Sequence, residues 1–490
     1  MKKILSLAIL FAYGLTPLFS QDKKTEIEVT RDFGVVSSGV MGNGNAYAEL
    51  LNSKPVKNKL AVTYKIFDHA LKELASIDAS INVGEQYQCN YADSQGIYSM
   101  YAKSLSGAFS FLYYNDGSVK TINGVLGPKA DCDKIIANGN MALAQVSDKD
   151  NNDFVLTADF ITGKSTPVIL NKQSPKADVN IISLSFNKQY NQYYVVYTLE
   201  EKKVKKLCLM TIDKELKPGE PMIVSTSSGE EKFLMTASMN PVGNNEFIVC
   251  GAYQNGSGEF ANGLYIGRWK NSAWSSIKYY SFADDFKHFT DYLSNKEKDR
   301  SENKKEKAAV NGKEFDLDVL MITHSLLNIK GTYVLIGEIY YPEYARYTDK
   351  DGVSQRVFMG YRYPKAVIVG FNAAFEKMWD NSFSVGLLGG TIPEEIVNVQ
   401  VIEDKIFLFF ENGNTIQSIR FNSDGEIDED RKTRGYSFAD EGESFTAGLG
   451  GDVSYWFDEY FLANMTVKEK SSGGKRWVFY MKKISLNETK

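Results

Sequence analysis

The sequence has few of the residues that usually carry catalysis and metal binding. Its 490 residues include only three histidines and four cysteines. His69, His288 and His324 are so far apart that a multi-histidine metal site would need three distant segments to converge. Gly-x-Ser-x-Gly, His-Glu-x-x-His, Walker and Gly-x-Gly-x-x-Gly motifs are all absent. These absences favour a binding protein over an enzyme, although carboxylate pairs formed through space leave no sequence motif.

The four cysteines show no Cys-x-x-Cys spacing, so a zinc or redox motif has no support. Cys208 and Cys250 lie in apolar, strand-like segments, which favours buried thiols over a disulfide. Cys89 and Cys132 lie in polar, loop-like segments, where the sequence leaves a disulfide and two free thiols equally open.

Long apolar runs are missing after the N-terminus, so no transmembrane span is expected in the mature chain. Residues 1–20 carry two lysines and then an apolar run over Ile4–Ala12, and they end in the small residue Ser20 before the polar Gln21. This pattern predicts a signal peptide over 1–20, cleaved near Ser20/Gln21. Because the first cysteine is Cys89, there is no lipid-attachment cysteine at that site. We therefore expect a periplasmic or extracellular protein.

Composition is that of a large folded protein. The chain is 43% hydrophobic and 13% aromatic, with a net charge of −5. Enough apolar material is present to exclude a disordered chain or a disulfide-stapled mini-protein, and the acidic balance argues against nucleic-acid partners. Because single barrels and sandwiches rarely exceed about 250 residues, several domains or one repeat architecture is expected.

A turn motif recurs along the chain. An apolar residue precedes Asp or Asn, two variable residues follow, and then an apolar residue or Gly precedes a mostly charged pair. Its clearest copies are Phe67–Lys72, Ile212–Lys217, Phe371–Glu376 and Phe421–Glu426. Asp, Asn and Gly tolerate the backbone conformations of hairpin turns, so each copy predicts a turn between two strands.

Apolar segments bounded by turn residues also recur, and they predict strands buried on both faces. They are Tyr193–Tyr197, Phe247–Cys250, Tyr333–Gly337, Ile406–Phe410 and Tyr460–Ala463. Tyr194 and Phe247 are 53 residues apart, and Ile406 and Tyr460 are 54 apart. The interval from Phe247 to Tyr333 is longer because it contains an insertion at about 284–315, and the interval from Tyr333 to Ile406 is longer because it contains an aromatic loop at about 342–361. A unit of about 50 residues with some four strands is the size of one propeller blade.

The chain thus resembles a β-propeller over residues 21–490. The resemblance is to the architecture and not to a named family, because Trp379-Asp380 is the only Trp-Asp pair and no Kelch-type double glycine recurs. An all-β propeller of seven or eight blades with one helical, charged insertion is expected. Its ring would be closed by Thr25–Thr30 pairing beside Trp477–Ile484, because a ring must hide its edge strands. Two β-sandwich domains are the alternative.

The insertion predicts a helix in two parts. Phe282, Phe286, Phe289 and Leu293 share one helical face, which is expected to pack on the sheet. Residues 296–307 contain ten charged side chains in twelve positions, so they predict a solvated helix extension or a mobile loop.

The aromatic loop is the candidate binding surface. It interleaves tyrosines with arginines, residue types that dominate interface hot spots and sugar-stacking platforms. The predicted binding residues are Tyr340, Tyr341, Tyr344, Arg346, Tyr347, Arg356, Tyr361 and Arg362. Several of these rings would instead belong to the core if the blade strands continue through the segment.

No cofactor is expected, although an acidic turn offers weak calcium candidates. Asp148, Asp150 and Asn152 supply oxygen ligands at alternate positions. Asp153 stands where a calcium loop needs glycine, so a plain solvated turn is favoured.

These observations predict a non-enzymatic binding or scaffolding subunit of the bacterial cell envelope, secreted across the inner membrane. Its partner would be an envelope protein or a glycan. The alternative is a carbohydrate-active hydrolase or lyase that uses carboxylates in the propeller funnel.

Overall fold

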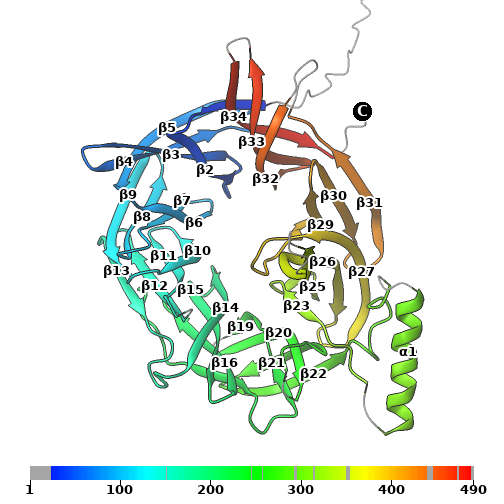
Figure 1. Ribbon diagram of the computed structural model, residues 1–490. Coiled ribbons are helices and arrows are strands. Elements are labelled where there is room, and N and C mark those ends of the chain that lie inside the picture. The colour runs from blue at the N-terminus through cyan, green and yellow to red at the C-terminus, as the bar shows by residue number, and fades with distance from the viewer. Residues whose placement is uncertain are drawn as a thin grey trace, which may run out of the picture.

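Short antiparallel strands joined by tight turns make up nearly all of the structure. The computed structural model describes residues 24–150, 152–243, 245–256, 258–291, 295–312, 315–348, 354–438, 445–471 and 474–486. Within these ranges the strands form eight antiparallel sheets, arranged as blades around a central opening (Figure 1). The chain is therefore an eight-bladed β-propeller, and the alternative of two β-sandwich domains is wrong. The predicted signal peptide lies outside the described residues.

Seven blades take their strands in chain order, from an inner strand beside the opening to an outer strand at the rim (Figure 1). Blade 1 contains β2 (Phe33–Val40), β3 (Ala46–Val56), β4 (Lys59–Phe67) and β5 (Glu73–Asn82), and blade 2 contains β6 (Gln86–Ala92), β7 (Ile97–Ala102), β8 (Ala108–Asn115) and β9 (Ser118–Val125). Blade 3 contains β10 (Asp131–Asn138), β11 (Met141–Ser147), β12 (Asp153–Asp159) and β13 (Lys164–Val168). Blade 4 contains β14 (Asp178–Asn187), β15 (Gln192–Glu201), β16 (Val204–Ile212) and β17 (Met222–Thr226).

Blades 5 and 6 each have an inner strand that is broken in two, so that two short strands pair with the second long one. Blade 5 contains β18 (Lys232–Leu234), β19 (Ser238–Gly243), β20 (Glu246–Asn255), β21 (Gly263–Lys270) and β22 (Ala273–Ser281). Blade 6 contains β23 (Leu320–Thr323), β24 (Leu327–Ile329), β25 (Thr332–Thr348), β26 (Ser354–Phe371) and β27 (Lys377–Leu388). Blade 7 contains β28 (Asn398–Ile402), β29 (Lys405–Asn412), β30 (Thr415–Phe421) and β31 (Ile427–Gly435).

Blade 8 joins the two ends of the chain. It contains β32 (Phe445–Phe457), β33 (Tyr460–Ser471) and β34 (Gly474–Ser485), and its outer strand is β1 (Lys24–Val29). β1 pairs antiparallel with β34, from Lys24 opposite Lys482 to Val29 opposite Trp477. The predicted closure of the ring by its terminal strands is therefore confirmed.

The recurring turn motif joins the third and fourth strands of blades 1, 4, 6 and 7. In the first copy, Asp68 accepts hydrogen bonds from the backbone N–H groups of Ala70 and Lys72, at 2.8 and 2.9 Å. Asp213 and Asn372 accept the same pair of bonds in their own turns. The fifth residue of the motif has a positive φ, which is 57° at Leu71 in the first copy. Burial of the Leu71 side chain offsets the backbone strain.

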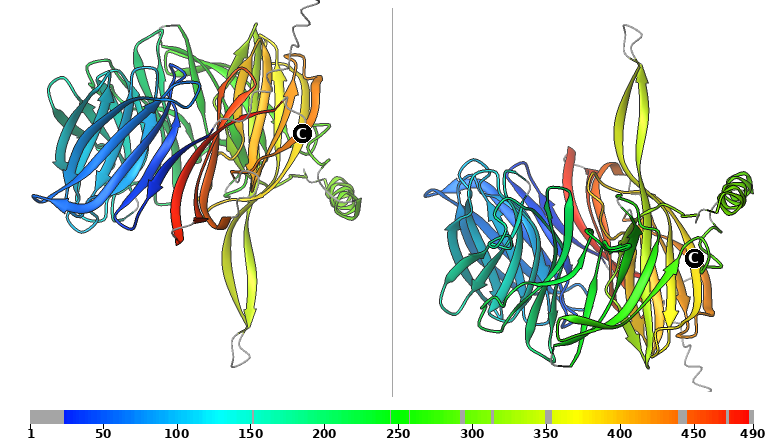
Figure 2. Two further views of the ribbon diagram at one scale, coloured as in Figure 1. Left: turned by 90° about the horizontal axis from the view of Figure 1, so that it is seen from above. Right: turned by 90° about the horizontal axis from the view of Figure 1, so that it is seen from below.

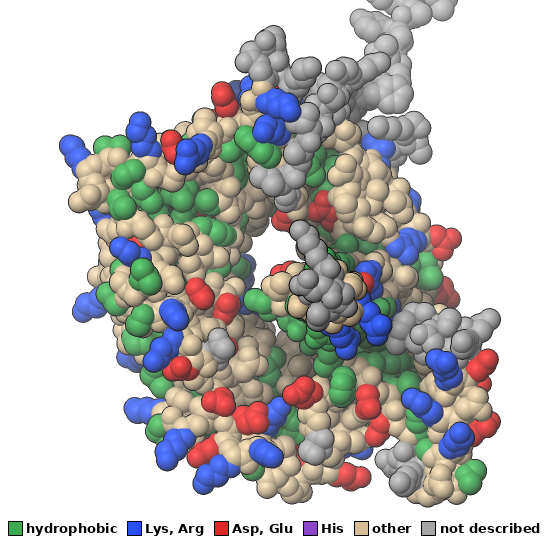
Figure 3. Space-filling view, viewed as in Figure 1, with side chains coloured by type: hydrophobic (Ala, Val, Ile, Leu, Met, Phe, Trp, Pro, Cys, Tyr) green, Lys and Arg blue, Asp and Glu red, His purple; other side chains and the backbone are tan. Residues whose placement is uncertain are grey.

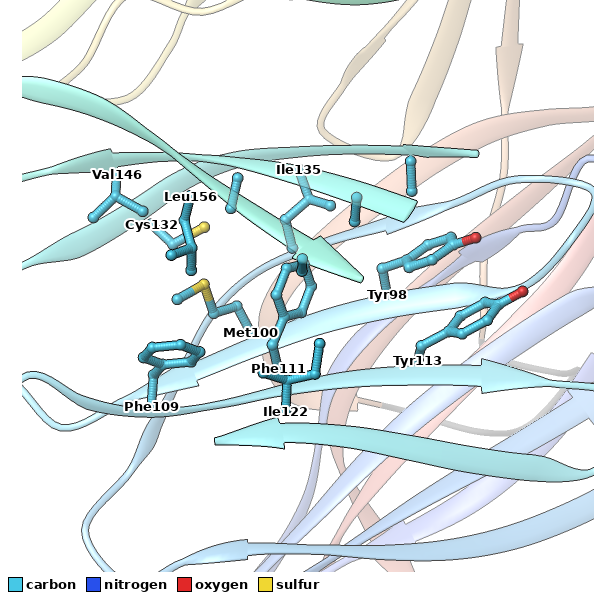
Figure 4. Packing of buried hydrophobic residues seen from close by; sticks show 14 of the residues in the cluster. Tyr98, Met100, Phe109, Phe111, Tyr113, Ile122, Cys132, Ile135, Val146 and Leu156 are labelled. Carbon is cyan, nitrogen blue, oxygen red and sulfur yellow. The ribbon is translucent and has the colours of Figure 1, made fainter. Parts of the chain in front are cut away.

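Apolar side chains fill the spaces between neighbouring blades. Figure 4 shows one such cluster, in which Met100, Phe109 and Phe111 of blade 2 lie against Ile135 and Leu156 of blade 3. Strands such as β7 are buried along their whole length because a blade lies on each side of them. This double burial explains why the second and third strands of a blade read as continuous apolar runs.

The insertion between blades 5 and 6 is helical, but not where the aromatic spacing predicts. α1 spans Asn295–Val310 and stands off the rim (Figure 2). Phe282, Phe286 and Phe289 instead lie in the irregular segment before α1. The rings of Phe282 and Phe289 stack on each other and are buried in the core between blades 5 and 6, and Phe286 packs against both at a tilted angle. Asp380 accepts bonds from the Lys287 and His288 N–H groups, which holds this segment and replaces a helical hydrogen-bond ladder. Leu293, the fourth residue of the predicted face, lies outside the described residues.

We expect α1 to be dispensable for folding. Deleting residues 296–307 and joining the ends with a short Gly-Ser linker removes exposed ion pairs such as Lys305–Asp284, at 2.6 Å, each worth at most about 1 kcal/mol, and a hydrogen bond from Lys305 to the Ala283 carbonyl. The melting temperature of the deletion variant, measured by circular dichroism, should stay within a few degrees of wild type.

The matched control for this deletion is Phe289→Ala, which empties a buried position beside the same insertion and should cost about 3–5 kcal/mol. A deletion variant that melts as low as this control would contradict the prediction.

Candidate functional site

The long hairpin of β25 and β26 departs most from the regular ring. We call its projecting part, residues 341–348 and 354–362, the arm. β23 pairs with β25 as far as Tyr340, and β27 pairs with β26 as far as Arg362, so the blade ends where the arm begins. Figure 2 shows the arm standing out from one face of the ring. In Figure 3 it is seen end-on beside the central opening, with Lys and Arg side chains gathered next to it.

The aromatic segment is therefore a pair of strands, and the prediction of a loop at about 342–361 is wrong. Residues 341–348 pair with 354–362, with register shifts at Ile339/Tyr341 and Glu343/Tyr344. Cross-strand pairs such as Tyr344 opposite Phe358 stabilise this ribbon without help from the blade. The register shifts mark bulges, which increase twist and turn a ribbon away from its sheet.

The structure divides the eight predicted binding residues between the arm's surface and its root. Tyr341, Tyr344, Arg346, Tyr347 and Arg356 are exposed, with 59% of the Tyr347 side chain accessible to solvent. The other three, Tyr340, Tyr361 and Arg362, are half-buried. Of these, the two tyrosines pack against the core between blades 6 and 7.

One face of the arm carries a continuous row of rings, which we call the aromatic ladder. It starts at Tyr340, the last blade residue before the arm, and continues to Tyr361, Phe358 and Tyr344, with successive ring centroids 5.4, 5.2 and 5.6 Å apart. The Arg356 guanidinium caps the row, 4.7 Å above the Tyr344 ring. Arg346 pairs directly opposite Arg356, so two like charges share this end of the face. Such an arrangement costs stability, and an anionic group placed between the two arginines would relieve the cost.

The other face of the arm pairs Glu343 with Arg362. The ion pair lowers the pKa of Glu343 and raises that of Arg362. Val357 and Met359 are exposed close by, at 46% and 49%. Sequence reasoning missed these two residues because only strand pairing, and no unusual composition, identifies them as surface residues.

A buried polar cluster anchors the arm at its root. Glu338, on β25 three residues before the arm, is fully buried and accepts hydrogen bonds from the N–H groups of Ile396 and Val397, at 3.1 and 3.0 Å. His324 lies 2.7 Å from Glu338 through Nε2 and 3.8 Å from Glu395 through Nδ1. Burial opposes a charge on the His324 ring, but the hydrogen bond and charge of Glu338 outweigh burial and raise the pKa of His324. This cluster ties the arm's first strand to the segment that enters blade 7.

In the candidate calcium turn, the side-chain oxygens of Asp148 and Asn152 accept backbone hydrogen bonds. Asp148 accepts bonds from the N–H groups of Asp150 and Asn152, and Asn152 accepts one from Val179. Residues 148–150 and 152 therefore form a hydrogen-bonded turn. Across the described ranges, no group of three or more His, Cys, Asp or Glu side chains is placed to hold a metal ion.

Three further acids with raised pKa values were not singled out by the sequence. Glu49 of blade 1 accepts bonds from the Ser99 and Tyr101 hydroxyls of blade 2, each 2.7 Å away, and burial raises its pKa. The pKa of Glu411 on β29, which is half-buried, is raised by desolvation, and so is that of Asp452 on the inner strand of blade 8, although Asp452 is accessible to solvent. The charge of Asp452 raises the pKa of Glu411 further, while Glu411 accepts a bond from the Tyr436 hydroxyl.

A surface cavity of about 350 Å³ lies between α1 and the segment over residues 315–319. Arg300 and Lys304 line it with Asp316 and Asp318. Both acids accept side-chain bonds from asparagines of blade 5, which ties the segment to the ring. The cavity is thus a gap between α1 and the ring, and none of its lining residues belongs to the arm.

The His324–Glu338 pair predicts a pH-dependent stability at the arm's root. Because the pKa of His324 is raised in the folded state, its stabilising effect is present below its ordinary value of about 6.5 and is lost as pH rises through the raised value. Wild type should lose melting temperature from about pH 6 to about pH 9 more steeply than His324→Gln, which keeps a hydrogen-bond donor but cannot be charged.

A His288→Gln variant is the matched control for this pH profile, because that histidine is exposed beside Asp291 and should leave the wild-type slope unchanged. Parallel profiles for wild type and His324→Gln would contradict the assignment.

Within the described residues no helix is long and apolar enough to span a membrane. No protein-family model matches this chain, and no curated protein does.

Similarity is found among solved structures. A puromycin hydrolase structure has 9% identity and a TM-score of 0.40 over 89% of this chain and 58% of its own. An acylaminoacyl peptidase of Pyrococcus horikoshii has 12% identity and a TM-score of 0.36 over 80% and 52%. A eukaryotic initiation factor has 9% identity and a TM-score of 0.37 over 94% and 98%. This chain spans about half the length of the peptidase and hydrolase chains that it matches. At these levels of similarity the comparisons carry no argument about activity.

Proposed function

We propose that the protein is a non-enzymatic binding or scaffolding subunit of the bacterial cell envelope and that the arm is its docking element. The observation that carries the proposal is the arm itself, a ribbon outside the ring that exposes three tyrosines and Phe358, with exposed Val357 and Met359 besides. A two-stranded ribbon is marginally stable in water, and it is stabilised when another surface covers its apolar side chains. The ring itself has no need of such an extension.

The chemistry of the arm favours a protein partner over a glycan. Tyr344 and Phe358 would stack on sugars or on apolar side chains alike, but aliphatic groups such as Val357 and Met359 suit a protein surface better. Arg346 and Arg356 add two guanidinium groups at one end of the aromatic ladder, so an acidic side chain is expected at the centre of the partner's site.

The cellular location rests on the sequence of residues 1–20. A charged start, a short apolar run and a small residue before Gln21 are typical of a signal peptide. A secreted protein with a rigid ring and one projecting arm suits an assembly role, because the ring holds the arm in a defined orientation.

Replacing Tyr344, Arg346 and Tyr347 together by Ala should abolish partner capture and leave the melting temperature nearly unchanged. All three side chains are exposed on the arm and contribute little to the core. The measurement is affinity purification from the native envelope, with wild type and variant side by side and each recovered protein identified by mass spectrometry.

The matched control replaces three exposed apolar residues of the ring, Leu105, Ile161 and Phe260, by Ala. It should recover the same partners as wild type. Identical partner sets from wild type and from the arm variant would overturn the docking assignment. Recovery of a glycan in place of a protein would contradict the protein partner and assign the arm to glycan binding.

The alternative function, a carbohydrate-active hydrolase or lyase, is favoured by one observation. Asp452 and Glu411 are neighbouring carboxyl groups with raised pKa values, and Asp452 is on the innermost strand of its blade. Glycosidases need two carboxyl groups of different protonation. Under this reading, wild type would release reducing sugar from envelope glycans and both Asp452→Asn and Glu411→Gln would abolish the release, whereas Asp428→Asn, at an exposed ion pair of blade 7, would not.

A further inference from the structure

Two of the four cysteines meet across a blade boundary. Cys89 is on β6 and Cys132 is on β10, the inner strands of blades 2 and 3. Their Sγ atoms lie 2.6 Å apart, although both cysteines are free thiols in the structure. Non-bonded heavy atoms pack at about 3.5–4.0 Å, so the two sulfurs are placed closer than packing alone would bring them.

Backbone irregularities bring the two side chains together. The register of β6 on β7 shifts between Tyr87 and Cys89, and that of β10 on β11 shifts between Cys132 and Lys134. A bulge re-aims the side chain beside it. The Cys132 N–H also donates to the Gln88 side chain, at 3.4 Å, which holds the two inner strands side by side.

The surroundings of the pair are apolar on one side and open on the other. Cys132 is buried in the cluster between blades 2 and 3, where Figure 4 shows it beside Val146 and Leu156. Cys89 packs against the same cluster but is only half-buried. A reagent in solvent can therefore reach Cys89 first.

Cys208 and Cys250 differ from this pair. Cys208 is on β16 and Cys250 on β20, and they are buried in separate apolar clusters, that of blades 3 and 4 and that of blades 5 and 6. The chain thus supplies two internal reference thiols that have no route to a bridge without unfolding.

We propose that Cys89 and Cys132 form a disulfide that joins blade 2 to blade 3. The oxidant is a disulfide of the dithiol–disulfide oxidoreductase class or a small-molecule disulfide in an oxidising compartment. The Cys89 thiolate attacks one sulfur of that disulfide and releases the first thiol. Cys132 then loses its proton and attacks the Cys89 sulfur of the mixed disulfide. The second thiol leaves, so two electrons and two protons pass from the cysteines to the oxidant. This inference stands on the geometry of the pair and does not depend on the arm.

Thiol counting tests the proposal directly. Purified chain is incubated with oxidised glutathione while folded, then denatured, and its free thiols are titrated with a chromogenic disulfide. Wild type should show two thiols per chain, and wild type kept in reductant should show four. A Cys208→Ser/Cys250→Ser variant should show none after oxidation, and peptide mapping should recover the Cys89 and Cys132 peptides linked. Reduction should lower the melting temperature of oxidised wild type by about 4 °C, the effect of opening a loop of about 43 residues in a chain of this size.

Four thiols after oxidation, glutathione retained on Cys89, or a bridge to Cys208 or Cys250 would each overturn the proposal. Cys89→Ser is the matched single variant, because the half-buried position tolerates serine. It should show three thiols, or two with one glutathione bound at Cys132, and no change in melting temperature on reduction. These outcomes are separate from partner capture by the arm, so failure of one proposal leaves the other standing.

Discussion

The pairing of β1 with β34 is the contact on which the rest of the structure depends. It joins residues 24–29 to residues 477–482 and so closes a ring from the two ends of the described chain. Each blade packs on two neighbours only when the ring is closed, and an open ring would expose two apolar faces and two strand edges. Contacts beside the seam reinforce it. Trp456 of blade 8 donates its indole N–H to the Gly44 carbonyl at 2.6 Å, and His69 of blade 1 stacks on Phe457.

A closed ring also decides which additions the fold tolerates. The arm and α1 both belong to the part of the chain that runs through blades 5 and 6, but their chemistry differs. α1 is highly charged and makes exposed ion pairs, which suits a segment in water. The arm exposes tyrosines, Phe358 and Met359, which suits a segment that another surface covers. Because blade packing supplies the stability, neither extension has to be stable alone.

Buried polar groups between blades constrain how the sheets align. Glu49 receives two hydroxyl bonds from blade 2, and Glu338 receives backbone bonds from the segment entering blade 7. Removing one partner of such a group leaves a buried carboxyl without its bond, which costs more than an apolar contact of the same size. Misalignment of neighbouring blades is therefore penalised at these positions beyond the loss of apolar packing.

Local chemistry determined much of this protein directly from its sequence. The repeat, the turns at Asp68, Asp213 and Asn372 and the closing strand were all predictable, because turn residues and two-sided burial leave a signature within a few positions. Long-range pairing was decided only by the tertiary structure. Residues 341–348 become a strand through pairing with 354–362, and Phe282 and Phe289 leave a helical pattern because Asp380, some 90 residues away, holds their turns. Cys89 and Cys132 meet for the same reason, since adjacent inner strands bring together residues that spacing along the chain cannot relate.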